Sequence, residues 1–234
     1  MAGTRLLSRV VLAVCLAAAP AIASPQPVGA HCPEDPAPGG RSYASGYDYL
    51  GGASNGIRGN ISWTNPPYCS NGGQNPFTME GVTLCPNDFC QGWVQVGWFE
   101  RFNVDTSPKF FCEYKRTDAV QATQYYLPLS AASHQYSWQR ESNGWWTCRL
   151  DGATQINTGQ VNFASGLWGN AQGETNAAHA QIGRMAPGSV LFSNLHYRSA
   201  GLWYTMGLTL PSASAPYGRD TIGGGTLRNW TNAH

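Results

Sequence analysis

The feature that most constrains this chain is an alternation of apolar and polar side chains along its aromatic segments. In residues 92–102, one face carries Val94, Val96 and Trp98, while Gln95 lies on the opposite face. A period of two residues is typical of a β-strand whose two faces meet different surroundings. No stretch of a dozen residues shows a 3.6-residue period without an interruption by glycine. We therefore expect an all-β chain.

Turn sequences separate several further segments of this kind. The Asn143-Gly144 dipeptide predicts a hairpin between residues 135–140 and 145–150, and Asp151-Gly152 predicts the next turn. Other strands are expected at residues 109–115, 160–163, 168–176, 189–197 and 202–208. Many short strands between turns are typical of sandwiches and barrels. We predict an antiparallel two-sheet β-sandwich of the jelly-roll type.

The first 23 residues have the pattern of a signal peptide. Arg5 and Arg9 precede an apolar run at residues 10–19, and residues 21–23 (AIA) have the small-x-small form of a cleavage site. The run is too short to span a bilayer, so we predict export rather than a membrane anchor. After residues 1–23 we expect a Pro- and Gly-rich linker or short pro-segment (residues 24–42), one domain (residues 43–210) and a loose tail (residues 211–234).

Removal of the signal peptide would leave six of the seven cysteines. An even number in an exported chain favours disulfides. The candidates are Cys32, Cys69, Cys85, Cys90, Cys112 and Cys148, and the sequence leaves their pairing open. There is no C-x-x-C pair and no H-E-x-x-H motif, so we expect neither a metal nor another cofactor.

The charge of the chain is close to balanced. Charged residues make up 12% of the 234, and the formal net charge is +1 at pH 7. No long-range field would attract nucleic acid or an anionic membrane surface. We expect a monomer with neither of these partners.

The polar sides of two predicted strands carry the candidate chemistry. Gln95 lies between Trp93 and Gly97, and a glycine on a strand often leaves room for a ligand. One face of the later strand carries Trp168, Asn170, Gln172, Glu174 and Asn176. This face is either a solvated surface or the floor of a groove for a sugar or an extended peptide.

Glu174 is the candidate general base, because it is the one carboxylate between Asp151 and Asp220. A carboxylate can take a proton from water. An amide N–H such as that of Gln95 can then stabilise the oxyanion that forms when the water attacks a carbonyl. The two residue types together favour hydrolysis.

Three other motifs compete with this pair. Residues 52–56 (GASNG) match G-x-S-x-G, but a Gly-rich turn leads here into a strand, which indicates a chance match. Glu113 could line the groove or pair with Lys115 or Arg116. His179 stands alone, and a lone histidine is usually structural.

Several short motifs resemble those of a known group, in the same order. They are residues 47–53 (YDYLGGA), 94–98 (VQVGW), 113–114 (EY), 143–146 (NGWW) and 168–174 (WGNAQGE) followed by 185–189 (MAPGS). On these motifs the chain resembles the glutamic peptidases. The first three are similar to segments of the eqolisin type, including the one that carries its catalytic Gln. The VQVGW segment and the last two motifs are similar to segments of the neprosin type.

The resemblance implies a sandwich of two large antiparallel sheets with a catalytic dyad on a concave face. It implies that Gln95 stabilises the oxyanion and that Glu174 acts as general base and then as acid. The residues expected to bind the substrate are Trp93, Trp168, Gln172 and Glu113. The implied activity is that of an exported endopeptidase that cleaves polypeptides at acidic pH without a cofactor.

Two other functions fit some of the same residues. A non-catalytic glycan-binding sandwich could use tryptophans as stacking platforms, and the candidates are Trp93, Trp98, Trp145, Trp146, Trp168 and Trp203. A glycosidase needs two suitably spaced carboxylates, for which Glu113 and Glu174 are the pair we would name. We rank the peptidase first, glycan binding second and the glycosidase last.

Overall fold

The computed structural model describes residues 42–64, 77–101, 105–175, 189–209, 213 and 217–231. The fold described below concerns the unit of residues 31–234 alone. The predicted signal peptide, Cys32, Cys69 and His179 lie outside the described residues. No helix in these ranges is long and apolar enough to cross a membrane.

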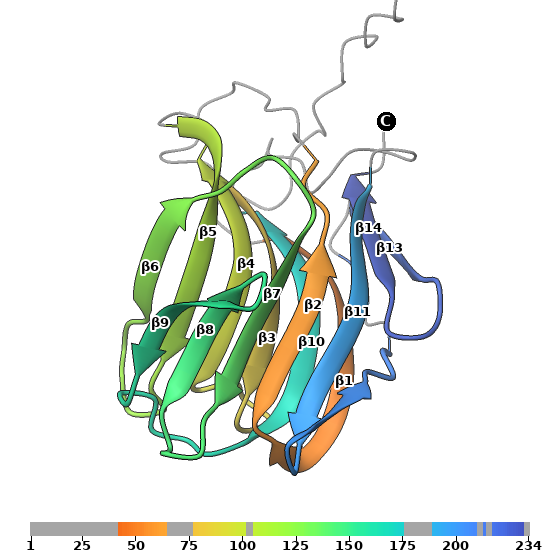
Figure 1. Cartoon of the computed structure of the whole chain (residues 1–234). Helices are drawn as coiled ribbons and strands as arrows, with labels where there is room; N and C mark the ends of the chain where they lie inside the picture. The colour runs from red at the N-terminus through yellow and green to blue at the C-terminus, as the bar shows by residue number, and fades with distance from the viewer. Residues whose placement is uncertain are drawn as a thin grey trace, which may run out of the picture. The chain divides into compact units, whose positions relative to one another are not determined.

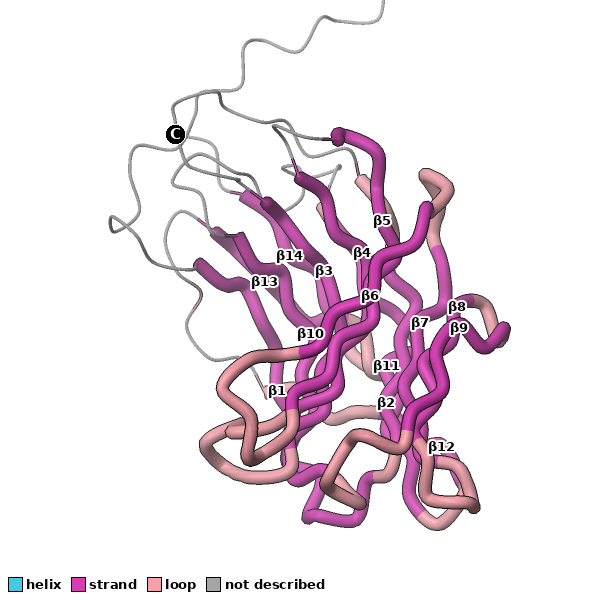
Figure 2. The backbone as a smooth tube through the Cα atoms, turned by 90° about the vertical axis from the view of Figure 1, so that its left-hand side faces the viewer, coloured by secondary structure: helices cyan, strands magenta, loops and turns pink. Residues whose placement is uncertain are grey.

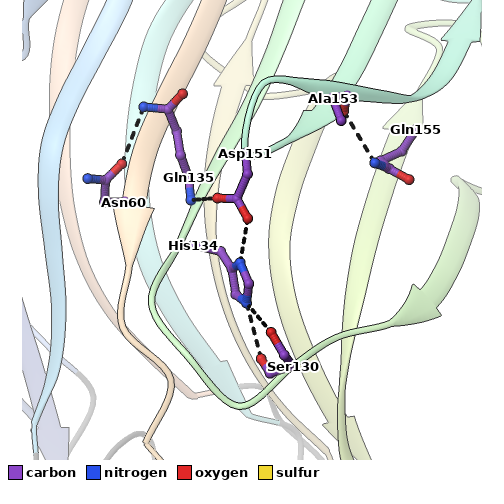
Figure 3. A network of polar contacts seen from close by, with 7 residues as sticks. All are labelled: Asn60, Ser130, His134, Gln135, Asp151, Ala153 and Gln155. Atoms are coloured by element: carbon purple, nitrogen blue, oxygen red, sulfur yellow. Dashed lines mark hydrogen bonds and ion pairs between the residues drawn. The ribbon is translucent and has the colours of Figure 1, made fainter.

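Two antiparallel sheets form the domain (Figure 1), and a second view shows strands and loops throughout the described part (Figure 2). The six-stranded sheet has the order β1 (Ser42–Ser54), β10 (Gly166–Thr175), β3 (Phe77–Cys85), β4 (Trp93–Arg101), β5 (Asp105–Lys115) and β6 (Thr123–Pro128). The eight-stranded sheet has the order β13 (Tyr217–Thr221), β14 (Leu227–Thr231), β11 (Val190–Ser199), β2 (Gly56–Ile61), β7 (His134–Arg140), β8 (Trp146–Leu150) and β9 (Ala153–Thr158), and β12 (Leu202–Thr205) pairs with β11.

The predicted all-β sandwich is confirmed, but several strand positions differ, and β3 and β6 lie where no strand was expected. The strand expected at residues 160–163 lies earlier, as β9, because Asp151 and Gly152 both have positive φ and turn the chain at once. The segment expected to be a loose tail contains β13 and β14. Its three glycines at residues 223–225 have positive φ and form a hairpin turn, and Leu227 beyond them is fully buried.

The core lies between the two sheets and is rich in tryptophan. Trp98 on the six-stranded sheet and Trp138 and Trp146 on the eight-stranded sheet are fully buried. Burial of a large apolar side chain contributes about 1.5–3 kcal/mol. Buried indole N–H groups need acceptors, and that of Trp138 donates across the core to the backbone oxygen of Gln95 at 2.8 Å. The eight-stranded sheet therefore helps to hold Gln95 in place.

Two disulfides settle the pairing of four cysteines. Cys112 of β5 is bonded to Cys148 of β8, so this bond joins the two sheets. Cys85 at the end of β3 is bonded to Cys90, five residues later, in the loop that leads to β4. Both bonds fit the predicted disulfide-containing sandwich and an oxidising compartment.

A carboxyl group is buried between the sheets. Glu80 of β3 has no exposed surface, and the side-chain amide of Asn229 on β14 donates to its Oε2 at 3.1 Å. The same amide nitrogen donates to the backbone oxygen of Ala44 on β1 at 3.1 Å. Burial raises the pKa of Glu80 well above its usual range, and the hydrogen bond from Asn229 opposes this only in part.

We predict that the substitution Glu80→Gln stabilises the protein at neutral pH and has little effect at acidic pH. Above the ordinary glutamate pKa of about 4.3, the unfolded chain has lost a proton that the folded chain keeps, so wild-type stability falls as pH rises through this window. The variant lacks this dependence. We expect a melting temperature a few degrees higher at neutral pH, since 1 kcal/mol corresponds to roughly 2–4 °C in a chain of this size. Thermal unfolding of both proteins at both pH values checks this, and an equal difference in melting temperature at both would contradict it.

We predict that the double substitution Cys112→Ser and Cys148→Ser lowers the free energy of unfolding by about 3–4 kcal/mol. The cross-link closes a separation of 36 residues and restrains the unfolded chain. The matched control, Cys85→Ser with Cys90→Ser, removes a cross-link between residues only 5 apart in the sequence. It should lower the free energy of unfolding by less. Denaturant unfolding measures both, and a larger loss in the control would overturn the argument.

Candidate active site

A groove of about 680 Å³ lies on the outer face of the six-stranded sheet. It lies on this face because Val94, Val96 and Trp98 point into the core and the alternate residues of β4 point away from it. All six site residues predicted from the sequence line this groove, and they are Trp93, Gln95, Glu113, Trp168, Gln172 and Glu174. Asn170 and Thr83 also line it, and the loop after β3 contributes Asn87 and Asp88.

One row of side chains crosses the groove at the level of Gln95. The strand register places Asn170 of β10 beside Thr83 of β3, and Thr83 beside Gln95 of β4. These side chains are 6%, 5% and 5% exposed. Asn170 Oδ1, Thr83 Oγ1 and Gln95 Nε2 have no hydrogen-bond partner in the described part of the chain. Buried polar atoms are rarely left in this state, so the row is suited to a ligand that offers both donors and acceptors.

Two glycines let β3 and β4 lie close together next to this row. Gly81 of β3 lies beside Gly97 of β4, one step along the sheet from Thr83 and Gln95. A Cβ atom at Gly97 would lie 1.9 Å from the backbone oxygen of Glu80, so no other residue fits there without a shift of the backbone. The two glycines thus allow the close approach of β3 and β4, and the ring of Phe111 on β5 lies over Gly81, with its Cζ 3.1 Å from where a Cβ of Gly81 would be.

Glu174 lies at the end of a ladder of polar side chains along β10. Asn170 Nδ2 donates to Gln172 Oε1 at 2.7 Å, and Gln172 Nε2 donates to Glu174 Oε2 at 3.4 Å. Glu174 is 3% exposed and is level with Met79 of β3. It is therefore four residues along β10 from Asn170, the residue level with Gln95. Gln172 lies between them, level with Gly81 of β3.

A second carboxylate, Glu113, is directly opposite Gln95 on the neighbouring strand β5. Its Oε1 accepts the indole N–H of Trp93, and its Oε2 accepts an amide N–H of Gln124 on β6. Both oxygens are thus engaged by protein donors. Glu113 forms a fixed negative wall of the groove.

Other residues singled out in the sequence do not form a competing site. Ser54, the serine of GASNG, is fully buried between β1 and β2 and donates its hydroxyl to the backbone oxygen of Gly56 at 2.9 Å. The turn joins two strands, as expected for a chance match. Within the described residues, no group of three or more His, Cys, Asp or Glu side chains is arranged to hold a metal ion.

Thr83, Asn170 and Asp88 are among the lining residues that were not assigned a role from the sequence. Thr83 lies in β3, whose other outer residues include Met79 and Gly81 and so give no polar pattern. The sequence placed Asn170 on the outer face of its strand. It could not show that Asn170 is level with Gln95, because that depends on the pairing of β10 with β3 and of β3 with β4. Asp88 lies in the loop after β3, and it contacts Trp168, a residue 80 positions later in the sequence, so no local pattern could indicate this contact.

No known protein family and no curated protein matches the sequence. The fold, however, is similar to solved structures of glutamic peptidases. Scytalido-glutamic peptidase with a transition-state analogue inhibitor has a TM-score of 0.59 and 12% identity, over 82% of this chain and 98% of that chain. SCP-B, a member of the eqolisin family of peptidases in complex with a tripeptide, has a TM-score of 0.55 and 12% identity, over 82% and 98%. The likeness supports the eqolisin part of the predicted resemblance at the level of the fold, while the neprosin part stays a prediction.

We predict that Gly97→Ala destabilises the protein by about 3 kcal/mol or more, because the added methyl group would overlap the backbone of β3. Gly207→Ala is the matched control, since a Cβ there meets no atom closer than 3.9 Å. The control should change the free energy of unfolding by less than about 0.5 kcal/mol. Denaturant unfolding of both variants is the measurement. Equal stabilities would show that β3 and β4 can separate without cost.

Proposed function

We propose that this protein is an exported glutamic-type endopeptidase that binds an extended polypeptide in the groove and hydrolyses it. The observation that carries the proposal is the row of buried, unpartnered atoms formed by Asn170, Thr83 and Gln95. An extended polypeptide offers a carbonyl oxygen and an N–H in alternation. Gln95 Nε2 would donate to the carbonyl, and Asn170 Oδ1 would accept the N–H. The eqolisin-like fold supports this assignment.

The hydrolytic step uses Glu174 as the base. Its carboxylate takes a proton from a water molecule while the water oxygen attacks the carbonyl carbon of the scissile bond. Gln95 Nε2 donates a hydrogen bond to the oxyanion that forms. Glu174 then returns the proton to the leaving nitrogen, the C–N bond breaks, and the products are a carboxylic acid and an amine. The register puts Glu174 two strands away from Gln95 and four residues along, so their Cα atoms are roughly 16–17 Å apart. In the proposed step the two side chains approach the scissile carbonyl and its water from opposite sides.

Glu174 is a better candidate for proton transfer than Glu113. Both oxygens of Glu113 already accept N–H groups, from Trp93 and Gln124. Glu174 accepts from Gln172 through Oε2, and Gln172 belongs to the ladder that connects Glu174 with the row at Gln95. We therefore assign Glu113 to substrate binding, together with Trp93, Trp168 and Gln172. As the resemblance implies, activity is expected at acidic pH.

The alternative of a glycan-binding protein loses several of its stacking platforms. Trp98 and Trp146 are fully buried in the core. The ring of Trp203 is covered by the guanidinium of Arg58 at 4.4 Å. Of the six tryptophans considered, Trp93 and Trp168 line the groove. Two rings at one end of a polar groove favour a polypeptide over a row of stacked sugars.

The test is cleavage of an unfolded protein substrate from acidic to neutral pH by the wild type and three variants. We expect Glu174→Gln to lose activity by about 10²–10⁴-fold and Gln95→Ala by about 10²–10³-fold, the usual contributions of a general base and an oxyanion donor. Glu113→Gln should retain turnover of bound substrate and raise KM. Circular dichroism checks that each protein is folded. Full activity of folded Glu174→Gln removes this residue from the mechanism, and an inactive, folded wild type removes the proposed function.

A further inference from the structure

Two indole rings flank one end of the groove. Trp168 of β10 is level with Cys85, the last residue of β3. Leu84 pairs with Val94, so Trp93 of β4 lies on the other side of Cys85. Since β10 and β4 are both neighbours of β3, the two tryptophans stand about 9–10 Å apart at the backbone. The Cys85–Cys90 disulfide lies between them and closes this end of the groove.

Both rings are held in position by a carboxylate. The indole N–H of Trp168 donates to Asp88 Oδ1 at 2.9 Å, and that of Trp93 donates to Glu113 Oε1. The outer sides of the rings are also covered. Tyr49 on β1 packs edge-on against Trp168, with ring centroids 4.9 Å apart.

Lys115 on β5 covers the outer side of Trp93, with its Nζ 4.9 Å from the ring centroid. The sides of Trp93 and Trp168 that border the groove are therefore the sides toward β3. A planar group of a ligand that lies above the disulfide can contact both rings.

The charge of the groove identifies the kind of group that fits. The lining residues in the described part of the chain include three carboxylates and neither a lysine nor an arginine, and the carboxylates are those of Asp88, Glu113 and Glu174. Asp88 Oδ2 makes no hydrogen bond within the described ranges, so this oxygen remains available beside Trp168. Aromatic faces and carboxylates together attract a cation.

We propose that this end of the groove is a subsite for one cationic side chain of the polypeptide, with arginine preferred over lysine. The guanidinium would lie between Trp93 and Trp168, above the disulfide, with Asp88 and Glu113 as its counter-charges. Arginine fits better because its planar group can stack on both rings and donate two hydrogen bonds to one carboxylate. The inference rests on the proposed function only in that the occupant is a polypeptide.

The test measures binding rather than cleavage, with the folded Glu174→Gln protein. The probes are peptides that are identical except for one central residue, which is arginine, lysine, citrulline, phenylalanine or alanine. Citrulline keeps the shape of arginine and removes its charge. We expect the arginine peptide to bind at least about 10-fold more tightly than the citrulline peptide, since a charge pair with stacking is worth about 1–2 kcal/mol. Calorimetric titration gives the dissociation constants.

Variants of the subsite sharpen the result. Asp88→Asn should remove most of the preference for arginine over citrulline, and Trp168→Leu should weaken every peptide with a planar central side chain. Trp145→Leu is the matched control, because Trp145 is 46% exposed and precedes β8 on the other sheet, so it should leave affinity unchanged.

The possible outcomes separate this inference from the proposed function. Tight, charge-dependent binding without cleavage by the wild type would support the subsite and overturn the peptidase. Cleavage by the wild type with equal affinity for arginine and citrulline peptides would support the peptidase and overturn the subsite. Tightest binding of the phenylalanine peptide, or no binding of any peptide to the folded protein, also overturns the subsite.

Discussion

Burial of one face of the six-stranded sheet against the eight-stranded sheet is the constraint on which the rest of the structure depends. Side chains alternate along a strand, so each apolar residue that packs inward turns its neighbours to the outer face. Val94 and Val96 are fully buried, and Gln95 between them must face outward. The indole N–H of Trp138 donates to the backbone oxygen of Gln95 from the core side. Packing between the sheets therefore sets the position of a polar side chain on the far side of one of them.

The outer face can be polar and almost closed to solvent because most of its groups satisfy one another. Glu113 accepts two N–H groups, and Asn170, Gln172 and Glu174 form a continuous ladder. A buried polar group without a partner destabilises a protein by about 1–3 kcal/mol. A ligand that satisfies the row at Gln95 would recover part of this free energy. Since the surrounding side chains of the protein are already ordered, they would lose little conformational entropy when the ligand binds.

The sequence predicted which residues share a face but not which residues are level with one another. Alternation alone places Gln95 and Glu174 on the outer face, because the apolar residues of each strand identify the inner one. Their level depends on pairing between strands that are distant in the chain, and the structure puts Asn170 opposite Gln95 across β3. The Cys112–Cys148 disulfide and the contact of Asp88 with Trp168 also arise from non-local pairing. The hairpin of β13 and β14 was missed for a local reason, since its run of three glycines is typical of a loop.

The burial of Asn229 has a consequence for how the protein can be produced. Residues 229–231 (NWT) form an acceptor sequence for N-linked glycans. The nitrogen that would carry the glycan, Asn229 Nδ2, instead donates to Glu80 and to the backbone of Ala44 inside the sandwich. A glycan attached before folding would leave Nδ2 a single N–H for these two acceptors and place a bulky polar group between the sheets. In a host that glycosylates its secreted proteins, the molecules that carry a glycan at Asn229 would thus be hindered from adding β14 to the sandwich.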